Sequence, residues 1–299
     1  MSKDQLATID YELRHRPDTS DLALADRRAE FAEWLTTNEG LPDVPAEAGE
    51  LGGVPVVRIG DDAVEDVLFF LHGGAYVIGD AASSAKLAGA IGARAGARVI
   101  SVDYRLAPEH PFPAGLDDAL AAYRAVLDSG VPATRIAFAG DSAGGGLVLA
   151  TLLAARDAGL PLPSSAALLS PWTDLTMSGA SLTERAEADP MLSAAGLAAL
   201  AEIYRGQTEA ANPLVSPLLA DLRGLPPLLI QVGSHEVLLD DSLRLAARAA
   251  RDEVEVRLEV TPGAPHVFPV FGKSLDEAMV ALDHIGEFVR ARFPAAVSA

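Results

Sequence analysis

Cysteine is absent from the 299 residues of this chain. Its absence excludes disulfide scaffolds, thiol catalysis, cysteine-ligated zinc and iron–sulfur clusters. A chain of this length typically forms about two domains. It buries a core large enough to fold without such cross-links. The lack of cysteine also agrees with a cytoplasmic protein, which is the location that we expect.

Basic residues are scarce as well. The chain has 23 Lys and Arg against 42 Asp and Glu, which gives a net charge of −19. Such a surface repels phosphate groups and anionic lipid, so we expect no nucleic-acid partner. The first 21 residues contain no apolar segment typical of a signal peptide, and no uncharged apolar run reaches the roughly 18 residues of a membrane span. We therefore also expect no membrane span.

Short apolar runs alternate with helical patterns along most of the chain. The runs at 67–71, 98–102, 135–139, 166–170, 228–232 and 256–260 predict strands, and the segments at 83–96, 115–129, 143–158, 193–205, 240–252 and 274–292 predict helices. Before them, the segments 45–51 and 54–59 flank Gly52-Gly53 and predict a hairpin. This order predicts an α/β protein with a mostly parallel eight-stranded sheet covered by helices on both faces.

The region before the hairpin, residues 1–40, is polar with a helical period. Its apolar residues Leu22, Leu24, Phe31, Trp34 and Leu35 predict one apolar stripe, and Gly40 ends the pattern.

Ligands of parallel α/β sheets bind beyond the carboxyl ends of the strands, so functional residues are expected directly after the strands. The segment GDSAGG at 140–145 follows one predicted strand and opens a helix. Gly140, Ser142 and Gly144 fit the pattern G-x-S-x-G, in which a serine occupies a tight strand-to-helix turn and the glycines allow close approach. The helix N-terminus favours developing negative charge at Ser142. A glycine-rich turn with an incidental serine is the simpler alternative, whereas a dinucleotide loop would need G-x-G-x-x-G.

The segment HGGAYVIGD at 72–80 follows another predicted strand. Consecutive glycines behind a strand leave backbone N–H groups unshielded. The N–H groups of Gly73 and Gly74, together with that of Ala143, would form an oxyanion hole. The alternative is a loop whose glycines serve only to turn the chain.

These segments occur together with YRLAPEHPFPAGLDD at 104–118 and SPWTDL at 170–175. In order and spacing they resemble the hormone-sensitive-lipase-like esterases of the α/β-hydrolase fold, over roughly residues 45–292. The resemblance implies a serine carboxylesterase that acts on a small-molecule ester and needs no cofactor or metal.

The segment at 104–118 also has a structural interpretation. Its prolines rigidify the loop, and we expect Asp103, Arg105 and Glu109 to form a local salt-bridge network. We interpret this segment as scaffold rather than as chemistry.

A serine nucleophile needs a base and an acid that orients the base. His266 follows the last predicted strand and matches the family's G-x-x-H-x-F pattern, in the chain order of this fold. Where the family usually has Asp, this chain has Glu236, which the resemblance makes the expected acid. Asp240 is the alternative and Asp241 a weaker third, and both also fit as acids at a helix N-terminus.

Two segments, residues 1–44 and about 177–212, are left over from the sheet. The resemblance implies that they form a small helical cap over a catalytic domain at 45–299. The cap residues that we expect in an acyl pocket are Trp34, Leu35, Met177, Met191, Leu192 and Tyr204. The alternative is that these residues are simply core. A cap this small predicts soluble short- or medium-chain esters rather than emulsified fat.

Two other functions remain open. An amidase or a deacetylase would use the same triad, and fold alone does not fix the substrate. A ligand-binding receptor of the same fold, as in plant gibberellin receptors that resemble this family, lacks the catalytic histidine, and His266 disfavours it. A homodimer is also left open.

Overall fold

The computed structural model describes residues 2–17, 19 and 21–295. Its centre is one sheet of eight strands, β1 (Ala46–Leu51), β2 (Val54–Ile59), β3 (Val67–Leu71), β4 (Arg98–Val102), β5 (Ile136–Asp141), β6 (Ser165–Leu169), β7 (Leu228–Gly233) and β8 (Val256–Thr261). The strand order is β1-β2-β4-β3-β5-β6-β7-β8. β2 is antiparallel to both of its neighbours, and all other neighbours are parallel. The predicted mostly parallel sheet is confirmed.

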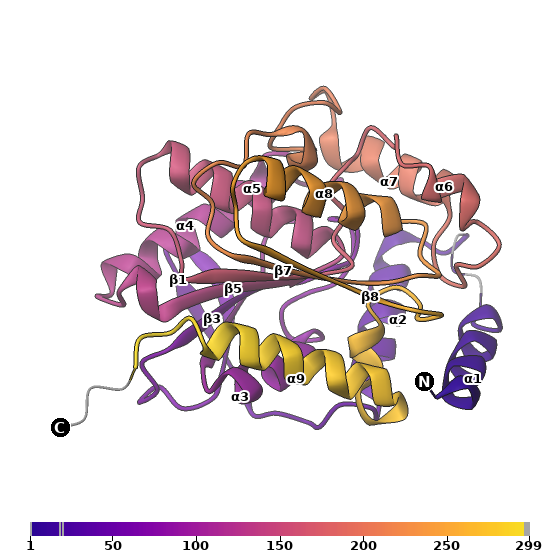
Figure 1. Ribbon diagram of the computed structural model, residues 1–299, viewed down its shortest axis with the longest axis horizontal. Coiled ribbons are helices and arrows are strands. Elements are labelled where there is room, and N and C mark those ends of the chain that lie inside the picture. Colours follow the sequence, from indigo (N-terminus) through magenta and orange to yellow (C-terminus); the bar gives the residue numbers. More distant parts are fainter. Residues whose placement is uncertain (1, 18, 20, 296–299) are drawn as a thin grey trace.

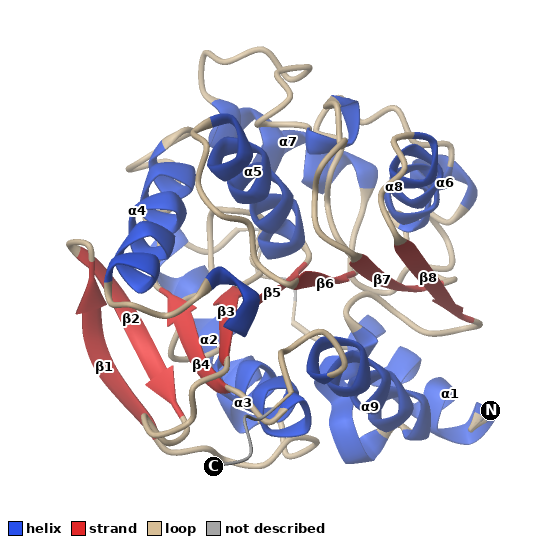
Figure 2. Cartoon of the chain, turned by 60° about the vertical axis from the view of Figure 1, so that its left-hand side comes forward, coloured by secondary structure: helices blue, strands red, loops and turns tan. Residues whose placement is uncertain are grey.

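Helices cover both faces of this sheet. The helices of the described residues are α1 (Lys3–Arg14), α2 (Leu24–Thr37), α3 (Ala85–Ala95), α4 (Ala114–Asp128), α5 (Ala143–Asp157), α6 (Ser181–Glu184), α7 (Ala194–Arg205), α8 (Leu239–Arg251) and α9 (Asp276–Arg290). Three short 3-10 helices lie at Ala133–Arg135, Pro217–Leu219 and Phe268–Ser274. Figure 2 shows α4, α5 and α8 on one face of the sheet and α3 and α9 on the other.

The central strand β3 explains why the predicted strands read as continuous apolar runs. Val67, Phe69 and Leu71 pack into the core beside α4 and α5, whereas Leu68 and Phe70 pack into the core beside α3 and α9. All five side chains are fully buried. Burying each contributes about 1.5–3 kcal/mol before entropy is counted, so both faces of the strand demand apolar residues.

The predicted hairpin is confirmed at β1 and β2. Leu51 pairs with Val54 across the two-residue turn. Gly52 and Gly53 both have positive φ, at +61° and +78°. A two-residue hairpin turn of this kind requires that conformation at both positions, which glycine adopts without strain.

The polar N-terminal region forms two helices, α1 and α2, rather than one helical stripe. Leu22 lies outside α2 and is 44 % exposed, so it does not join the predicted apolar face. In Figure 1, α1, α2, α6 and α7 gather at one end of the sheet. Within the part of the chain that the structure describes, none of the helices has the length and hydropathy needed to cross a bilayer.

The salt-bridge network expected within the proline-rich loop does not form. Arg105 pairs instead with Asp118 of α4, at 2.7 Å between nitrogen and oxygen. Glu109 pairs with Arg28 of α2, also at 2.7 Å, and Asp103 accepts a hydrogen bond from a backbone N–H at 3.1 Å. The three side chains point outward to separate elements, so the loop is tied to its neighbours rather than to itself.

Candidate active site

Ser142 stands between β5 and α5 in a conformation that few non-glycine residues adopt, with φ +52° and ψ −122°. The main chain around it is held on both sides. Its N–H donates to the carbonyl of Leu169 at 2.8 Å, and its carbonyl accepts the N–H of Trp172 at 2.9 Å. Glycine is required nearby, because a Cβ on Gly144 would lie 2.1 Å from the carbonyl oxygen of Leu71. β5, α5 and β3 therefore meet at the turn that carries the Ser142 hydroxyl.

His266 lies beside this hydroxyl. It belongs to the loop after β8 and is 4 % exposed. Its Nε2 lies 2.8 Å from Ser142 Oγ, and its Nδ1 lies 2.7 Å from Glu236 Oε2. The carboxylate assigns the tautomer, because Nδ1–H must donate to it and Nε2 is then free to accept the hydroxyl proton. The structure thus brings the three predicted residues into one hydrogen-bonded chain.

Glu236 comes from the loop after β7 and is fully buried. Its second oxygen, Oε1, accepts hydrogen bonds from the Ser170 hydroxyl at 2.7 Å and from the N–H of Gly233. The same Ser170 Oγ accepts the N–H of Val267, the residue after His266, at 3.0 Å. Ser170 therefore holds both Glu236 and the main chain next to His266. This role of Ser170 was not predicted, although Ser170 opens the SPWTDL segment and follows β6 at the same sheet edge.

The electrostatics of the pair favour a basic imidazole. Burial lowers the pKa of His266, but the hydrogen bond and charge of Glu236, with the charges of Asp189 and Asp141, raise it above the ordinary 6.5. Burial raises the pKa of Glu236, and its three donors oppose that rise. An ionised glutamate at this position would stabilise a protonated imidazole at His266.

The two alternative acids lie elsewhere. Asp240 accepts the N–H of Ser181 at 3.0 Å. Asp241 is buried and accepts the N–H groups of Thr173 and Asp174 at 2.7 and 2.9 Å, and burial raises its pKa to about 7. Among the residues that the structure describes, neither aspartate makes a hydrogen bond to His266.

The predicted oxyanion loop needs one correction. The N–H of Gly73 already donates to Asp141 Oδ1 at 3.0 Å, so it is not a free donor. The N–H groups of Gly74, Ala75 and Ala143 have no acceptor among the residues described. Ala75 has a positive φ of +53°, which turns the chain here. The signal for Ala75 was its place directly after the two glycines.

The residue that engages Gly73 was not predicted. Asp141 precedes Ser142, and its carboxylate fills the space beside Gly73, where a Cβ would lie 2.2 Å from Oδ2. Burial raises the pKa of Asp141 to about 6, against the opposing hydrogen bond from Gly73. The loop is fixed from the other side by the Tyr104 hydroxyl, which donates to the carbonyl of His72 at 2.7 Å. His72 itself stacks on the Tyr104 ring.

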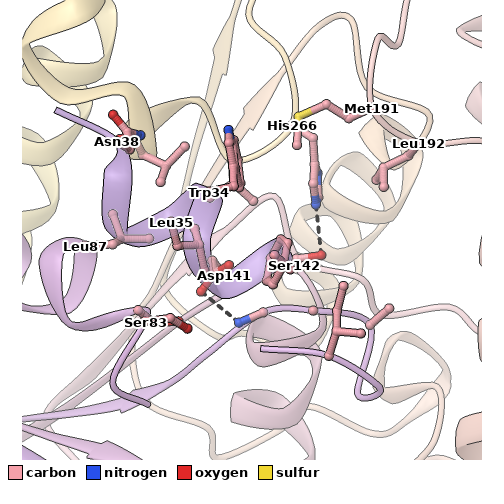
Figure 3. Close-up of a pocket in the computed structure, with 18 of the residues that line it drawn as sticks. Trp34, Leu35, Asn38, Ser83, Leu87, Asp141, Ser142, Met191, Leu192 and His266 are labelled. Carbon is pink, nitrogen blue, oxygen red and sulfur yellow. Dashed lines mark hydrogen bonds between the residues drawn. The ribbon is translucent and has the colours of Figure 1, made fainter. Parts of the chain in front are cut away.

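A pocket of about 320 Å³ opens onto Ser142. Among the residues predicted for it, Trp34, Leu35, Met191 and Leu192 line its wall. Figure 3 shows Leu35, Asn38, Ser83 and Leu87 on one side of Ser142 and Met191 and Leu192 on the other.

Tyr204 and Met177, which were also predicted for the pocket, do not line it. Tyr204 lies near the end of α7, is 3 % exposed and stacks on Tyr76 with 3.7 Å between ring centroids. α7 instead supplies Leu197 and Leu200 to the pocket. Their spacing of three residues places both on one helix face, and this was the sequence signal for them.

No group of three or more His, Asp or Glu side chains is arranged to hold a metal ion in the described ranges, 2–17, 19 and 21–295.

The chain is similar to a known protein family and to several hydrolases. Residues 68–270 match the family model described as alpha/beta hydrolase fold. An acetyl-hydrolase of Streptomyces hygroscopicus is 45 % identical over 81 % of this chain and 85 % of its own. A carboxylesterase of Mycobacterium tuberculosis is 35 % identical over 82 % of each chain.

Solved structures agree with these relatives. A crystal structure of an esterase from the bacterial hormone-sensitive lipase family is 40 % identical, with a TM-score of 0.93 and coverage of 98 % of this chain and 100 % of that one. The esterase EstE5, crystallised and soaked with p-nitrophenyl butyrate, is 39 % identical, with a TM-score of 0.90 and coverage of 96 % and 98 %.

Proposed function

Because this chain belongs to the hormone-sensitive-lipase-like esterases of the α/β-hydrolase fold and is a carboxylic ester hydrolase, we propose that it cleaves short- to medium-chain esters through an acyl-enzyme on Ser142. The observation that carries the proposal is the hydrogen-bonded chain from Glu236 through His266 to Ser142, with distances of 2.7 and 2.8 Å. Each member contributes one step of acyl transfer.

Acylation begins when Ser142 Oγ attacks the ester carbonyl carbon and its proton passes to Nε2 of His266. Glu236 holds the ring in place and stabilises the imidazolium. When the tetrahedral intermediate collapses, the bond to the alcohol oxygen breaks and His266 returns the proton to the leaving alcohol. Water then attacks the acyl-enzyme with His266 again as the base, which releases the acid and restores Ser142.

The negative charge on the tetrahedral intermediate needs donors that are already in place. We assign this role to the N–H groups of Gly74, Ala75 and Ala143, because none of them has an acceptor in the described part of the chain. Gly73 keeps its bond to Asp141. The N-terminus of α5 adds a favourable dipole at the same point.

The size and lining of the pocket support a short acyl chain. About 320 Å³ is at the small end of the range for ligand sites, roughly 300–1,000 Å³. Its wall combines apolar side chains with a few polar ones, among them Asn38 and Ser83. EstE5 was soaked with a butyrate ester, and another relative is named an acetyl-hydrolase, which supports the same range. A cytoplasmic location belongs to the same proposal.

A panel of p-nitrophenyl esters from acetate to palmitate, with a p-nitroanilide as the amide control, tests this function. We expect kcat/KM to be highest at about C4–C8, the anilide to be cleaved far more slowly, and EDTA to change nothing. A higher kcat/KM on C16 than on C4, or a jump in rate at an oil–water interface, would show a true lipase. Equal rates on the anilide and the ester would favour the amidase alternative.

A further inference from the structure

Asp189 is a buried carboxylate in the segment between α6 and α7, and it is 6 % exposed. Its Oδ1 accepts the N–H groups of Met191 and Leu192, at 2.8 and 2.9 Å. These bonds close a tight turn, and the side chains of that turn form one wall of the pocket, as Figure 3 shows. One oxygen of Asp189 therefore fixes the wall on the Met191 side.

The other oxygen of Asp189 reaches a different part of the molecule. Its Oδ2 accepts the N–H of Val237 at 2.9 Å, across 48 residues of sequence. Val237 is the residue directly after Glu236. The carbonyl of Val237 is held as well, because it accepts the Ser181 hydroxyl at 2.6 Å. The main chain beside the acid is thus tied to the same carboxylate as the pocket wall.

Asp189 also acts on the histidine through its charge. Burial and the contacts of Glu236 dominate the pKa of His266, and the charges of Asp189 and Asp141 add to the rise. On its solvent side the segment is held by Arg14 of α1, which donates to the carbonyls of Glu187 and Ala188 at 3.1 Å each.

We propose that Asp189 is a positioning residue that joins the pocket wall at Met191 and Leu192 to the loop that carries Glu236, so that one buried carboxylate sets both the chain-length selectivity and the alignment of the triad. This inference rests on the proposed function, since it assigns Glu236 and His266 their catalytic roles. A residue that only stabilised the fold would change neither selectivity nor the pH profile.

The experiment compares Asp189→Asn with the wild type on p-nitrophenyl butyrate and octanoate between about pH 5 and 9. The amide removes the charge, and its single oxygen cannot accept from both Val237 and the turn: with the oxygen on Val237, the NH2 group opposes the N–H groups of Met191 and Leu192, which lose their acceptor. We expect the acid limb of kcat/KM to move to lower pH, because a negative charge near His266 is lost. We also expect the ratio of kcat/KM on octanoate to kcat/KM on butyrate to rise by roughly 3- to 10-fold, because the pocket wall at Met191 and Leu192 is held less firmly.

Asp240→Asn is the matched control. Asp240 also joins the segment around α6 to α8, through the N–H of Ser181 at 3.0 Å, but it touches neither the pocket wall nor Val237. We expect its pH limb and its octanoate-to-butyrate ratio to equal those of the wild type.

Asp189→Ser separates the two effects. A serine hydroxyl can still close the turn at Met191 and Leu192, but it carries no charge and is too short to reach Val237. We expect its acid limb to move as in Asp189→Asn while its chain-length ratio stays near that of the wild type.

Several results would overturn the proposal. A uniform loss of kcat/KM on both esters with an unmoved acid limb, or no change at all, would make Asp189 a structural residue only. Failure of both variants to fold, checked by circular dichroism, would do the same. The proposed function fails separately: an active Ser142→Ala variant would remove the triad assignment itself, whatever Asp189 does.

Discussion

The backbone of Ser142 is held in a strained conformation. Its positive φ, +52°, costs on the order of 1–3 kcal/mol for a non-glycine residue. Hydrogen bonds from Ser142 to Leu169 and from Trp172 to Ser142 hold that conformation. Strain of this kind persists only where the surroundings fix it, and here it aims the hydroxyl at His266.

Substitutions of Glu236 and Asp240 should identify the acid of the triad. Glu236→Gln should lower kcat by roughly 10⁴, as loss of the orienting carboxylate does in serine proteases. Glu236→Asp should be milder, because it keeps the charge and only shortens the reach. Asp240→Asn should stay near wild-type activity, since Asp240 binds Ser181 and not His266.

Kinetics on the three folded variants check this prediction. Loss of several orders of magnitude in Asp240→Asn, with Glu236→Gln still active, would make Asp240 the acid. The triad would then be Ser142, Asp240 and His266.

The pH dependence follows from His266. In the proposed mechanism the neutral imidazole is the base, so kcat/KM should fall as the pH drops through the pKa of this residue. Burial lowers that pKa, but Glu236, Asp189 and Asp141 together raise it above the ordinary 6.5. The midpoint of the acid limb should therefore lie above 6.5. A profile of kcat/KM that is flat between about pH 5 and 8 would argue against a histidine base.

At the scale of elements, α2 is fastened to the loops that build the site. Arg28 of α2 donates to the carbonyl of Val77, in the loop after β3, at 2.9 Å. It also donates to the carbonyl of Ala107 at 3.0 Å and pairs with Glu109. The proline-rich loop thus holds α2 over the oxyanion loop, and its role in the site is mechanical.

The close contact of Gly144 in α5 with Leu71 of β3 predicts that a larger residue at position 144 destabilises the fold. Gly144→Ala would place a methyl group 2.1 Å from the carbonyl oxygen of Leu71 and 2.5 Å from that of His72. Backbone at that distance cannot move aside cheaply, so we expect a loss of about 1–3 kcal/mol or more in the free energy of unfolding. Denaturant unfolding measures it.

Gly196→Ala is the control for this substitution. Gly196 lies in α7, and a methyl group there would meet only Ser193 Oγ at 3.1 Å. Its stability should stay within about 1 kcal/mol of the wild type, because alanine is the better helix former. A Gly144→Ala variant as stable as Gly196→Ala would contradict the close-contact argument.

At the scale of the whole molecule, the sheet brings distant residues together. Ser142 and His266 are 124 residues apart in sequence, and Glu236 and His266 are 30 apart, yet each pair is hydrogen bonded. Each of the three follows a different strand, and the parallel strands end at one edge. The topology alone therefore predicts that side chains in these loops can meet.

The sequence predicts the sheet well because its strands are buried on both faces. In β3 every side chain is apolar, so the strand reads as an uninterrupted run. The G-x-S-x-G turn is equally readable, because its glycines are required by close backbone contacts. Local patterns of this kind carry their own physical cause, and resemblance to a known family added the positions of Glu236 and His266.

Contacts between segments that only tertiary structure brings together could not be read in this way. The bond between Asp189 and Val237 spans 48 residues and has no local pattern. Tyr204 was expected in the pocket because it lies in the segment predicted to form the cap, but the structure buries it in α7 against Tyr76. Gly73 was predicted as an oxyanion donor, but its N–H donates to the side chain of Asp141, which no local sequence pattern indicates.

The central claim is that Ser142 forms the acyl-enzyme. Its most direct test is covalent labelling with diethyl p-nitrophenyl phosphate, in which Ser142 Oγ forms a bond to phosphorus and p-nitrophenolate leaves. Mass spectrometry of peptides should find one diethylphosphoryl group, on Ser142, in proportion to lost activity, and none on Ser142→Ala. A label on another residue, or full activity in protein labelled at Ser142, would contradict the account.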